Sequence, residues 1–174
     1  AFLQKDKLIQ LEELERLIGA FVRCGVRKIR LTGGEPLLRR GVVEFLGCLK
    51  KFSEIEDLAL TTNGLLLPTF ASGLAEAGLH RVTVSLDALD PNIFARMNGR
   101  GKHPDQVLKG IEAAKSAGLR VKVNMVVQRG VNDDELVDMA RFGREVGVTV
   151  RFIEFMPLDA TGEWQRSDVV SHEE

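Results

Sequence analysis

The chain is poor in the residues that build metal sites and disulfide frameworks. Its 174 residues include two cysteines and three histidines. Cys24 and Cys48 stand far apart and have no CxxC spacing, which predicts two buried, reduced thiols and a cytoplasmic location. His80, His103 and His172 are scattered without an HxxxH or HExxH pattern. Histidine therefore provides no predicted metal site.

The chain also lacks long apolar runs, an excess of charge and the common nucleotide-binding motifs. No apolar stretch approaches the roughly 20 residues that span a bilayer, and no signal peptide is visible. The net charge is -1 and the basic residues are spread out, which argues against a nucleic-acid or membrane surface. Neither a P-loop nor a GxGxxG pattern occurs. A composition of 44% hydrophobic and 28% charged residues predicts one globular domain with a real core.

What the chain does contain is a regular alternation of helices and strands. Four expected helices end at a glycine that is followed by Val or Leu and then by a strand, at Gly25, Gly78, Gly118 and Gly147. This order predicts an α/β fold with parallel strands and right-handed crossovers. The expected helices span about 11–24, 41–51, 68–77, 104–117 and 132–146, with a short one beginning at 90–91. The expected strands span 28–32, 58–61, 81–86, 121–127 and 148–155.

Two caps and one acidic cluster are predicted within this pattern. Asp90 before Pro91 has the character of a helix N-cap, and Asn132 with Glu135 three residues later has that of a capping pair. The acids at 133–135 suit a helix N-terminus better than a divalent metal site.

Polar residues stand at or near the C-terminal end of every expected strand, and most strands have one polar and one aliphatic face. A buried central strand of a doubly wound sheet would be almost wholly apolar. A barrel whose interior is lined with ligand-binding groups toward its C-terminal mouth explains the pattern better. The polar residues are Thr32, Thr61, Thr62, Asn63, Ser85, Asp87, Lys122, Asn124 and Arg151.

The stretch from Lys28 to Leu37 has the strongest binding character. Lys28, Arg30 and Thr32 share one strand face, and Gly33 with Gly34 permits a close backbone approach before Glu35 and Pro36. The stretch predicts a binding rim, although an ordinary strand with a tight turn would explain the two glycines alone.

Six ordered motifs resemble the molybdenum-cofactor biosynthesis protein A family, the GTP 3′,8-cyclases of the radical S-adenosylmethionine (SAM) superfamily. The Gly-Gly-Glu-Pro turn points to the superfamily, and the full set is specific to the family. The motifs are KIRLTGGEPLLRR (28–40), LTTNG (60–64), VSLD (84–87), VKVN (121–124), GVNDDE (130–135) and RFIEFM (151–156).

The resemblance implies a partial (β/α)6 barrel over residues 1–157 that lacks its first strand, and a polar tail over 158–174 that leads to an absent C-terminal part. It implies a lyase in which a SAM-derived 5′-deoxyadenosyl radical abstracts hydrogen from the GTP ribose. A bond between C3′ and C8 then gives (8S)-3′,8-cyclo-7,8-dihydroguanosine 5′-triphosphate.

Site residues follow from the resemblance by position. Lys28, Arg30 and Arg151 would bind the GTP triphosphate, which agrees with the preference of converging cations for a polyanion. The SAM site would consist of Gly33, Gly34, Glu35, Pro36, Thr61, Asn63, Ser85, Lys122 and Met156.

The [4Fe–4S] clusters of the family take cysteine ligands that lie outside this chain, so the chain alone is expected to be inactive. An electron donor and the next enzyme of the pathway are the expected functional partners, and a homodimer is a candidate assembly. Three alternatives remain: a radical-SAM enzyme with another substrate, a phosphosugar aldolase or epimerase that uses Lys122, and a non-catalytic nucleotide-binding module.

Overall fold

The computed structural model describes residues 9–98, 101–156 and 164–173. Within them, five parallel strands form one sheet in the order β1-β2-β3-β4-β5. The strands are β1 (Lys28–Leu31), β2 (Asp57–Thr62), β3 (Arg81–Ser85), β4 (Arg120–Val127) and β5 (Thr149–Glu154). The helices are α1 (Leu11–Arg23), α2 (Val42–Cys48), α3 (Leu67–Glu76), α4 (Pro91–Asn98), α5 (Pro104–Ser116) and α6 (Leu136–Val146). Short 3-10 turns are η2 (Pro36–Leu38), η3 (Leu49–Lys51), η4 (Asp133–Glu135) and η5 (Arg166–Asp168).

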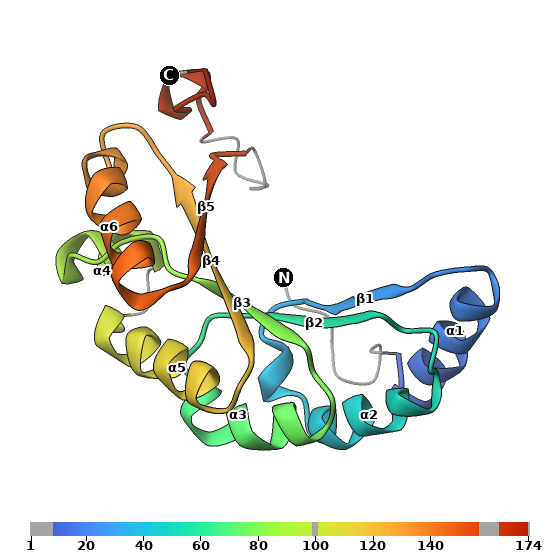
Figure 1. The fold of residues 1–174 in the computed structure, drawn as a ribbon. Coiled ribbons are helices and arrows are strands. Elements are labelled where there is room, and N and C mark those ends of the chain that lie inside the picture. Colours follow the sequence, from blue (N-terminus) through green and yellow to red (C-terminus); the bar gives the residue numbers. More distant parts are fainter. Residues whose placement is uncertain (1–8, 99–100, 157–163, 174) are drawn as a thin grey trace.

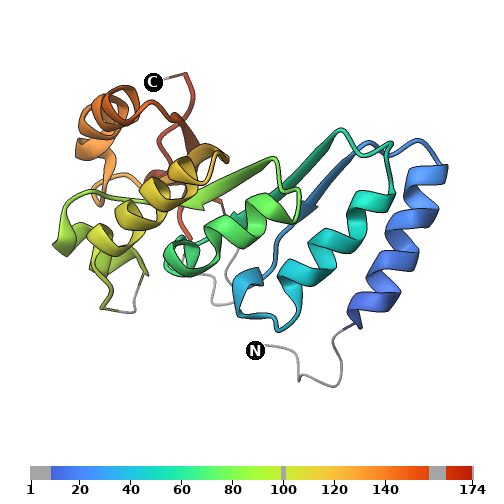
Figure 2. The ribbon, with the colours of Figure 1, turned by 60° about the horizontal axis from the view of Figure 1, so that its bottom comes forward.

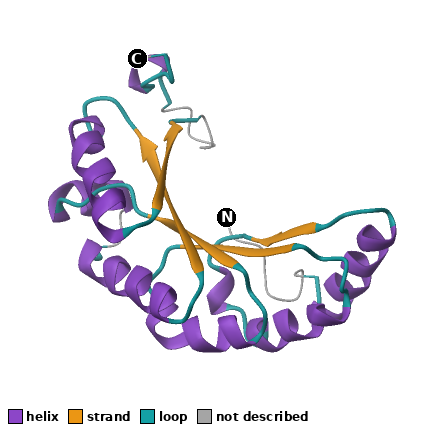
Figure 3. Cartoon of the chain, viewed as in Figure 1, coloured by secondary structure: helices purple, strands orange, loops and turns teal. Residues whose placement is uncertain are grey.

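The sheet curves, and the helices lie along its outer, convex side (Figure 1, Figure 2). The concave side carries no helix in the described part of the chain, as Figure 3 shows. Within the described residues β1 and β5 each pair with a single neighbouring strand, so the sheet does not close on itself. The parallel α/β arrangement and the partial barrel are as predicted from the sequence.

Side-chain alternation separates the two faces of the sheet chemically. Residues directed at the helices are aliphatic and buried, such as Leu58 and Leu60 of β2, Val82 and Val84 of β3, and Val123 of β4. They pack against buried apolar side chains of the helical layer, among them Leu46, Leu74 and Ile111. The hydrophobic core therefore lies between sheet and helices, and the concave face is left to polar side chains.

The four predicted glycine stops are confirmed. Gly25, Gly78, Gly118 and Gly147 follow their helices with φ between +72° and +94°, a left-handed conformation that glycine adopts without steric cost. Asp90 also caps α4 as predicted, since its carboxylate accepts hydrogen bonds from the backbone N–H groups of Asn92 and Ile93.

The predicted capping pair of Asn132 and Glu135 is wrong. Helix α6 begins at Leu136, and neither side chain caps it. The Asn132 amide is fully buried and bonds to backbone groups at the ends of β3 and β4 instead. Backbone groups at the strand ends need hydrogen-bond partners where the strand pairing stops. Satisfying these buried groups stabilises the protein more than capping α6 would.

The expected burial of the two cysteines is also wrong, because both thiols are exposed and free. Cys24 follows the last residue of α1, where Ile18 and Val22 already form the buried stripe. Cys48 lies beside the buried stripe of α2 rather than on it.

Residues 164–173 contact the end of the sheet. Gln128 forms an antiparallel bridge with Val169, and Trp164 Nε1 donates to the Phe155 carbonyl over 3.2 Å. Most of the first half of the predicted polar tail lies outside the described residues, and the domain boundary at residue 157 stays a prediction. Of the helices described, none is long and apolar enough to cross a membrane.

The packing of α5 on the turn after β2 generates a stability prediction. A Cβ at Gly110 of α5 would overlap the Gly64 carbonyl oxygen, which belongs to rigid backbone. We expect Gly110→Ala to lower the free energy of unfolding by about 1–3 kcal/mol, the usual cost of overpacking. Urea unfolding followed by circular dichroism measures it.

Gly47 is the matched control, because it lies in α2 and an added Cβ there would meet nothing within 4 Å. Gly47→Ala should leave stability unchanged or raise it by up to about 1 kcal/mol. Equal effects of the two substitutions would contradict the described packing of α5.

Candidate functional site

The strand register brings six of the predicted site residues onto the concave face. Residues paired across parallel strands point to the same side of the sheet, and every second residue along a strand does so too. The register pairs Lys28 with Asp57, Thr61 with Thr83, Thr83 with Lys122, and Ser85 with Asn124. The six predicted residues on this face are Lys28, Arg30, Thr61, Ser85, Lys122 and Arg151.

The predicted GTP-binding cations are divided between the two edges of the sheet. Lys28 and Arg30 are exposed on β1, and Arg151 lies on β5 at the opposite edge. Arg151 Nε donates to Asn124 Oδ1 over 3.0 Å, which orients the guanidinium along the concave face. The three cations share a face, but no contact joins the two groups within the described chain.

Glu35 joins the loop after β1 to the end of β2. Its Oε1 accepts from the Leu37 N–H over 3.1 Å and from Thr62 Oγ1 over 2.8 Å. Its Oε2 accepts from the Asn63 N–H over 2.7 Å. The carboxylate thereby fixes the Gly-Gly-Glu-Pro loop beside Asn63. Because a carboxylate offers about four lone-pair sites, Glu35 keeps acceptor capacity for an amino group.

The glycine loop is open toward solvent. Gly33 has φ of +150°, and an added Cβ would meet nothing within 4 Å. Bare backbone at the C-terminal end of a parallel strand is a suitable cradle for a small polar ligand.

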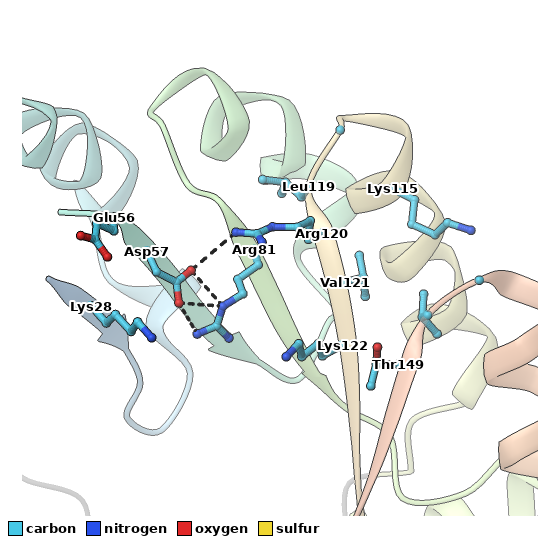
Figure 4. A pocket seen from close by; sticks show the side chains of 13 residues that line it. Lys28, Glu56, Asp57, Arg81, Lys115, Leu119, Arg120, Val121, Lys122 and Thr149 are labelled. Atoms are coloured by element: carbon cyan, nitrogen blue, oxygen red, sulfur yellow. Dashed lines mark hydrogen bonds and ion pairs between the residues drawn. The ribbon is translucent and has the colours of Figure 1, made fainter. Parts of the chain in front are cut away.

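A hollow of about 830 Å³ occupies the other end of the concave face, where the strands begin (Figure 4). Figure 4 shows side chains from several strands turned into this space. Its charged lining comprises five cations and two acids: Lys28, Arg81, Lys115, Arg120, Lys122, Glu56 and Asp57. The excess of positive charge favours an anionic ligand.

Asp57 and Arg81 form an ion pair in this hollow that the sequence did not indicate. Arg81 Nη2 lies 2.6 Å from Asp57 Oδ2, and Arg81 Nε lies 3.0 Å from both carboxylate oxygens. This hydrogen bonding, together with the charges of Arg81 and Arg120, lowers the pKa of Asp57 against the opposing effect of burial. The sequence does place a polar residue first on each strand. The pair was not predicted because the site was expected at the C-terminal ends of the strands.

Thr83 lies on the same face between Arg81 and Ser85 and is fully buried. Its Oγ1 has no hydrogen-bond partner in the described part of the chain. Such a buried hydroxyl without a partner is uncommon in folded proteins.

The described residues contain no group of three or more His, Cys, Asp or Glu side chains that could hold a metal ion. Cys24 and Cys48 lie at the ends of α1 and α2, on the convex side of the sheet. The residues present therefore do not fit an iron–sulfur cluster.

Met156 is 48% exposed just beyond β5 and lines a second hollow, together with Trp164 and His172. Its predicted contact with adenine remains a prediction, as do the ligand roles of the other predicted site residues.

The Asp57–Arg81 pair generates a prediction about acid stability. Arg81→Met should lower the free energy of unfolding at pH 7 by about 1–2 kcal/mol, because it leaves a partly buried carboxylate without its main partner. Since the pKa of Asp57 is lowered on folding, the pair stabilises fully above the unfolded value of about 3.9 and less as pH falls through the folded pKa. Urea titrations at pH 7 and pH 3 should show the difference between the two proteins shrinking in acid.

Arg141→Met is the matched control, because Arg141 pairs with Asp138 on the exposed surface of α6. It should change stability by no more than about 0.5 kcal/mol. A constant effect of Arg81→Met across pH would show that the ion pair does not shift the titration of Asp57.

Comparisons with known proteins find relatives over almost the whole chain. The chain is 44% identical over 173 residues to the GTP 3′,8-cyclase of Staphylococcus carnosus, covering 99% of this chain and 51% of the relative. It is 50% identical over 169 residues to the GTP 3′,8-cyclase of Paracoccus denitrificans, covering 96% and 49%. The chain thus spans about half the length of the curated relatives it matches. The phosphosugar aldolase alternative is not favoured.

The fold also matches a solved structure, Streptococcus suis SuiB bound to S-adenosylmethionine. The TM-score is 0.71 at 22% identity, over 87% of this chain and 34% of that one. At this identity the match supports the fold alone.

The family model for the radical SAM superfamily matches residues 2–143. With most of its length matched by that model and a partial barrel of the corresponding fold, this chain belongs to the radical SAM superfamily.

Proposed function

We propose that the complete protein carrying this chain is a GTP 3′,8-cyclase of molybdenum cofactor biosynthesis. The observation that carries the proposal is the shared concave face, on which the strand-borne cations and the candidate SAM-binding residues lie together. The identity of 44–50% to relatives of that name supports the choice among radical-SAM activities.

In this proposal the cations bind and orient the triphosphate. Lys28 and Arg30 project from β1, and Arg151 approaches from β5 with its guanidinium held by Asn124. Arginine pairs with phosphate oxygens through two parallel N–H groups, which fixes orientation as well as charge. The excess positive charge at the strand starts would attract the same polyanion to the hollow.

SAM would bind on the same face toward the ends of the strands, with Lys122 lying between this site and the hollow. Gly33, Gly34, Glu35 and Pro36 would receive its amino group, and Ser85 with Lys122 its carboxylate. Thr61 and Asn63 would contribute further contacts, and Met156 would adjoin its adenine. When bound and reductively cleaved, SAM supplies the radical that removes a hydrogen atom from the ribose. The residues of this chain contribute position and the exclusion of competing reactions.

Further parts of the proposal concern partners and location. Reductive cleavage needs an electron, so a donor protein or small reductant is required. The cyclised nucleotide would pass to the next enzyme of cofactor synthesis. Two exposed free thiols suit a reducing cytoplasm, which we propose as the location. The homodimer stays a prediction.

The direct test is turnover by the complete protein after anaerobic reconstitution of its clusters. With GTP, SAM and dithionite, we expect 5′-deoxyadenosine and a cyclised guanosine triphosphate in equal amounts, measured by liquid chromatography and mass spectrometry. Formation of 5′-deoxyadenosine without consumption of GTP would overturn the substrate assignment.

A substitution in β1 tests the triphosphate contact in the same assay. Arg30→Met should raise KM for GTP by about tenfold or more, since it removes charge-assisted hydrogen bonds to phosphate. KM for SAM should stay close to the wild-type value.

Arg40→Met is the matched control, because Arg40 is exposed just after η2 and outside the concave face. It should leave both KM values unchanged. An equal rise in KM for GTP in both variants would indicate a general loss of positive charge rather than a contact from Arg30.

A further inference from the structure

The loop after β4 holds the turn after β3. The turn comprises residues 86–90 and directly follows Ser85, the last residue of β3. The loop comprises residues 128–135 and contains the GVNDDE motif, whose predicted capping role is wrong. Polar side chains of the loop reach across about 45 residues of sequence to bond the backbone of the turn.

Asn132 is the buried centre of this contact. Its Nδ2 donates to the Asp87 carbonyl over 2.7 Å and to the Val126 carbonyl over 2.8 Å, and its Oδ1 accepts from the Gln128 N–H over 2.8 Å. One fully buried amide therefore joins the turn, the end of β4 and the start of the loop.

Glu135 fixes the far end of the turn. Its Oε2 accepts from the Leu89 N–H over 2.8 Å, and its Oε1 accepts from the Asp90 N–H over 2.7 Å. Asp90 in turn caps α4 through Asn92 and Ile93. The carboxylate thus determines where the turn ends and where α4 begins.

Further hydrogen bonds join the turn after β3 directly to β4. The Leu86 N–H donates to the Asn124 carbonyl over 2.9 Å, and Asp87 Oδ1 accepts from the Val126 N–H over 2.8 Å. Ser85 pairs in register with Asn124, two residues after Lys122. Most of the backbone between Ser85 and α4 is consequently tied to β4 or to its loop.

We propose that Asn132 and Glu135 are positioning residues that hold Ser85 against β4 and thereby set the affinity for SAM. This inference rests on the proposed role of Ser85 and Lys122 in binding the SAM carboxylate. Because Leu89 and Asp90 are only partly buried, water can replace the Glu135 carboxylate. Loss of Glu135 should therefore loosen the turn without unfolding the sheet. A residue that contributed only to stability would instead lower the melting temperature when it is lost.

The test compares two neighbouring carboxylates in the complete, anaerobically reconstituted protein. Glu135→Gln replaces one acceptor oxygen with a donor, whereas Asp134→Asn removes the charge of an exposed side chain one residue earlier. We expect Glu135→Gln to raise KM for SAM by about tenfold, with KM for GTP within about twofold of wild type. The melting temperature should match that of Asp134→Asn, which should behave as wild type.

Two results with Glu135→Gln would overturn the inference. One is an unchanged KM for SAM in Glu135→Gln. The other is a general loss, in which both KM values, kcat and the melting temperature worsen together, as expected for a purely structural contact. If Glu135→Gln does not fold, Glu135→Asp keeps the charge but shortens the reach, and a wild-type KM for SAM in that variant overturns the inference.

The readout also separates this inference from the proposed function. KM for SAM is measured from 5′-deoxyadenosine formed in the absence of GTP, so the comparison does not depend on the substrate. A wild-type protein that cleaves SAM but leaves GTP unchanged would refute the cyclase assignment, and the comparison of Glu135 with Asp134 would still decide the positioning role.

Discussion

Side-chain alternation along the parallel strands is the constraint on which the rest of this structure depends. Helices cover one face of the sheet, so every second residue must be apolar to fill the core, as Val82 and Val84 do on β3. The residues between them are released from the core and share a single concave face. A shift of one residue in register would bury Lys122 and expose the aliphatic set, so the fold and the site are specified together.

Because all five strands run in the same direction, the concave face also has two distinct ends, one at the strand starts and one at the strand ends. Strand starts gather Lys28, Arg120 and the Asp57–Arg81 pair, and strand ends gather the glycine loop, Ser85 and Met156. Arg151 is level with Ser85, because both pair in register with Asn124. The strand ends are held at two places. At one edge Glu35 ties the loop after β1 to β2. Further along the sheet, the loop after β4 ties the turn after β3. Both devices use a side chain to satisfy backbone groups where the ladder stops, which the end of any parallel strand requires.

Most helix and strand positions and the polar face of the sheet could be predicted from sequence, because periodicity and glycine positions are local signals. The helix ends at Gly25 and Gly147 and the polar face with Lys122 all follow from neighbouring residues. The Asp57–Arg81 pair and the burial of Asn132 could not be predicted in the same way. Each depends on which strands become neighbours, and the local pattern around Asn132 equally suited a helix cap. Contacts across 24 and 45 residues become visible only once the sheet order is known.

The central claim is that one face of the sheet holds both reactants, with the triphosphate bound by cations of β1 and β5 and SAM beside β3 and β4. Lysine acetylation rates in the complete protein, measured by peptide mass spectrometry with each ligand separately, test it most directly. We predict that GTP slows acetylation of Lys28, that SAM slows acetylation of Lys122, and that neither affects Lys51, which pairs with Glu15 in the helical layer. Acetylation of Lys28 and Lys122 at the same rates with and without the ligands would contradict the account.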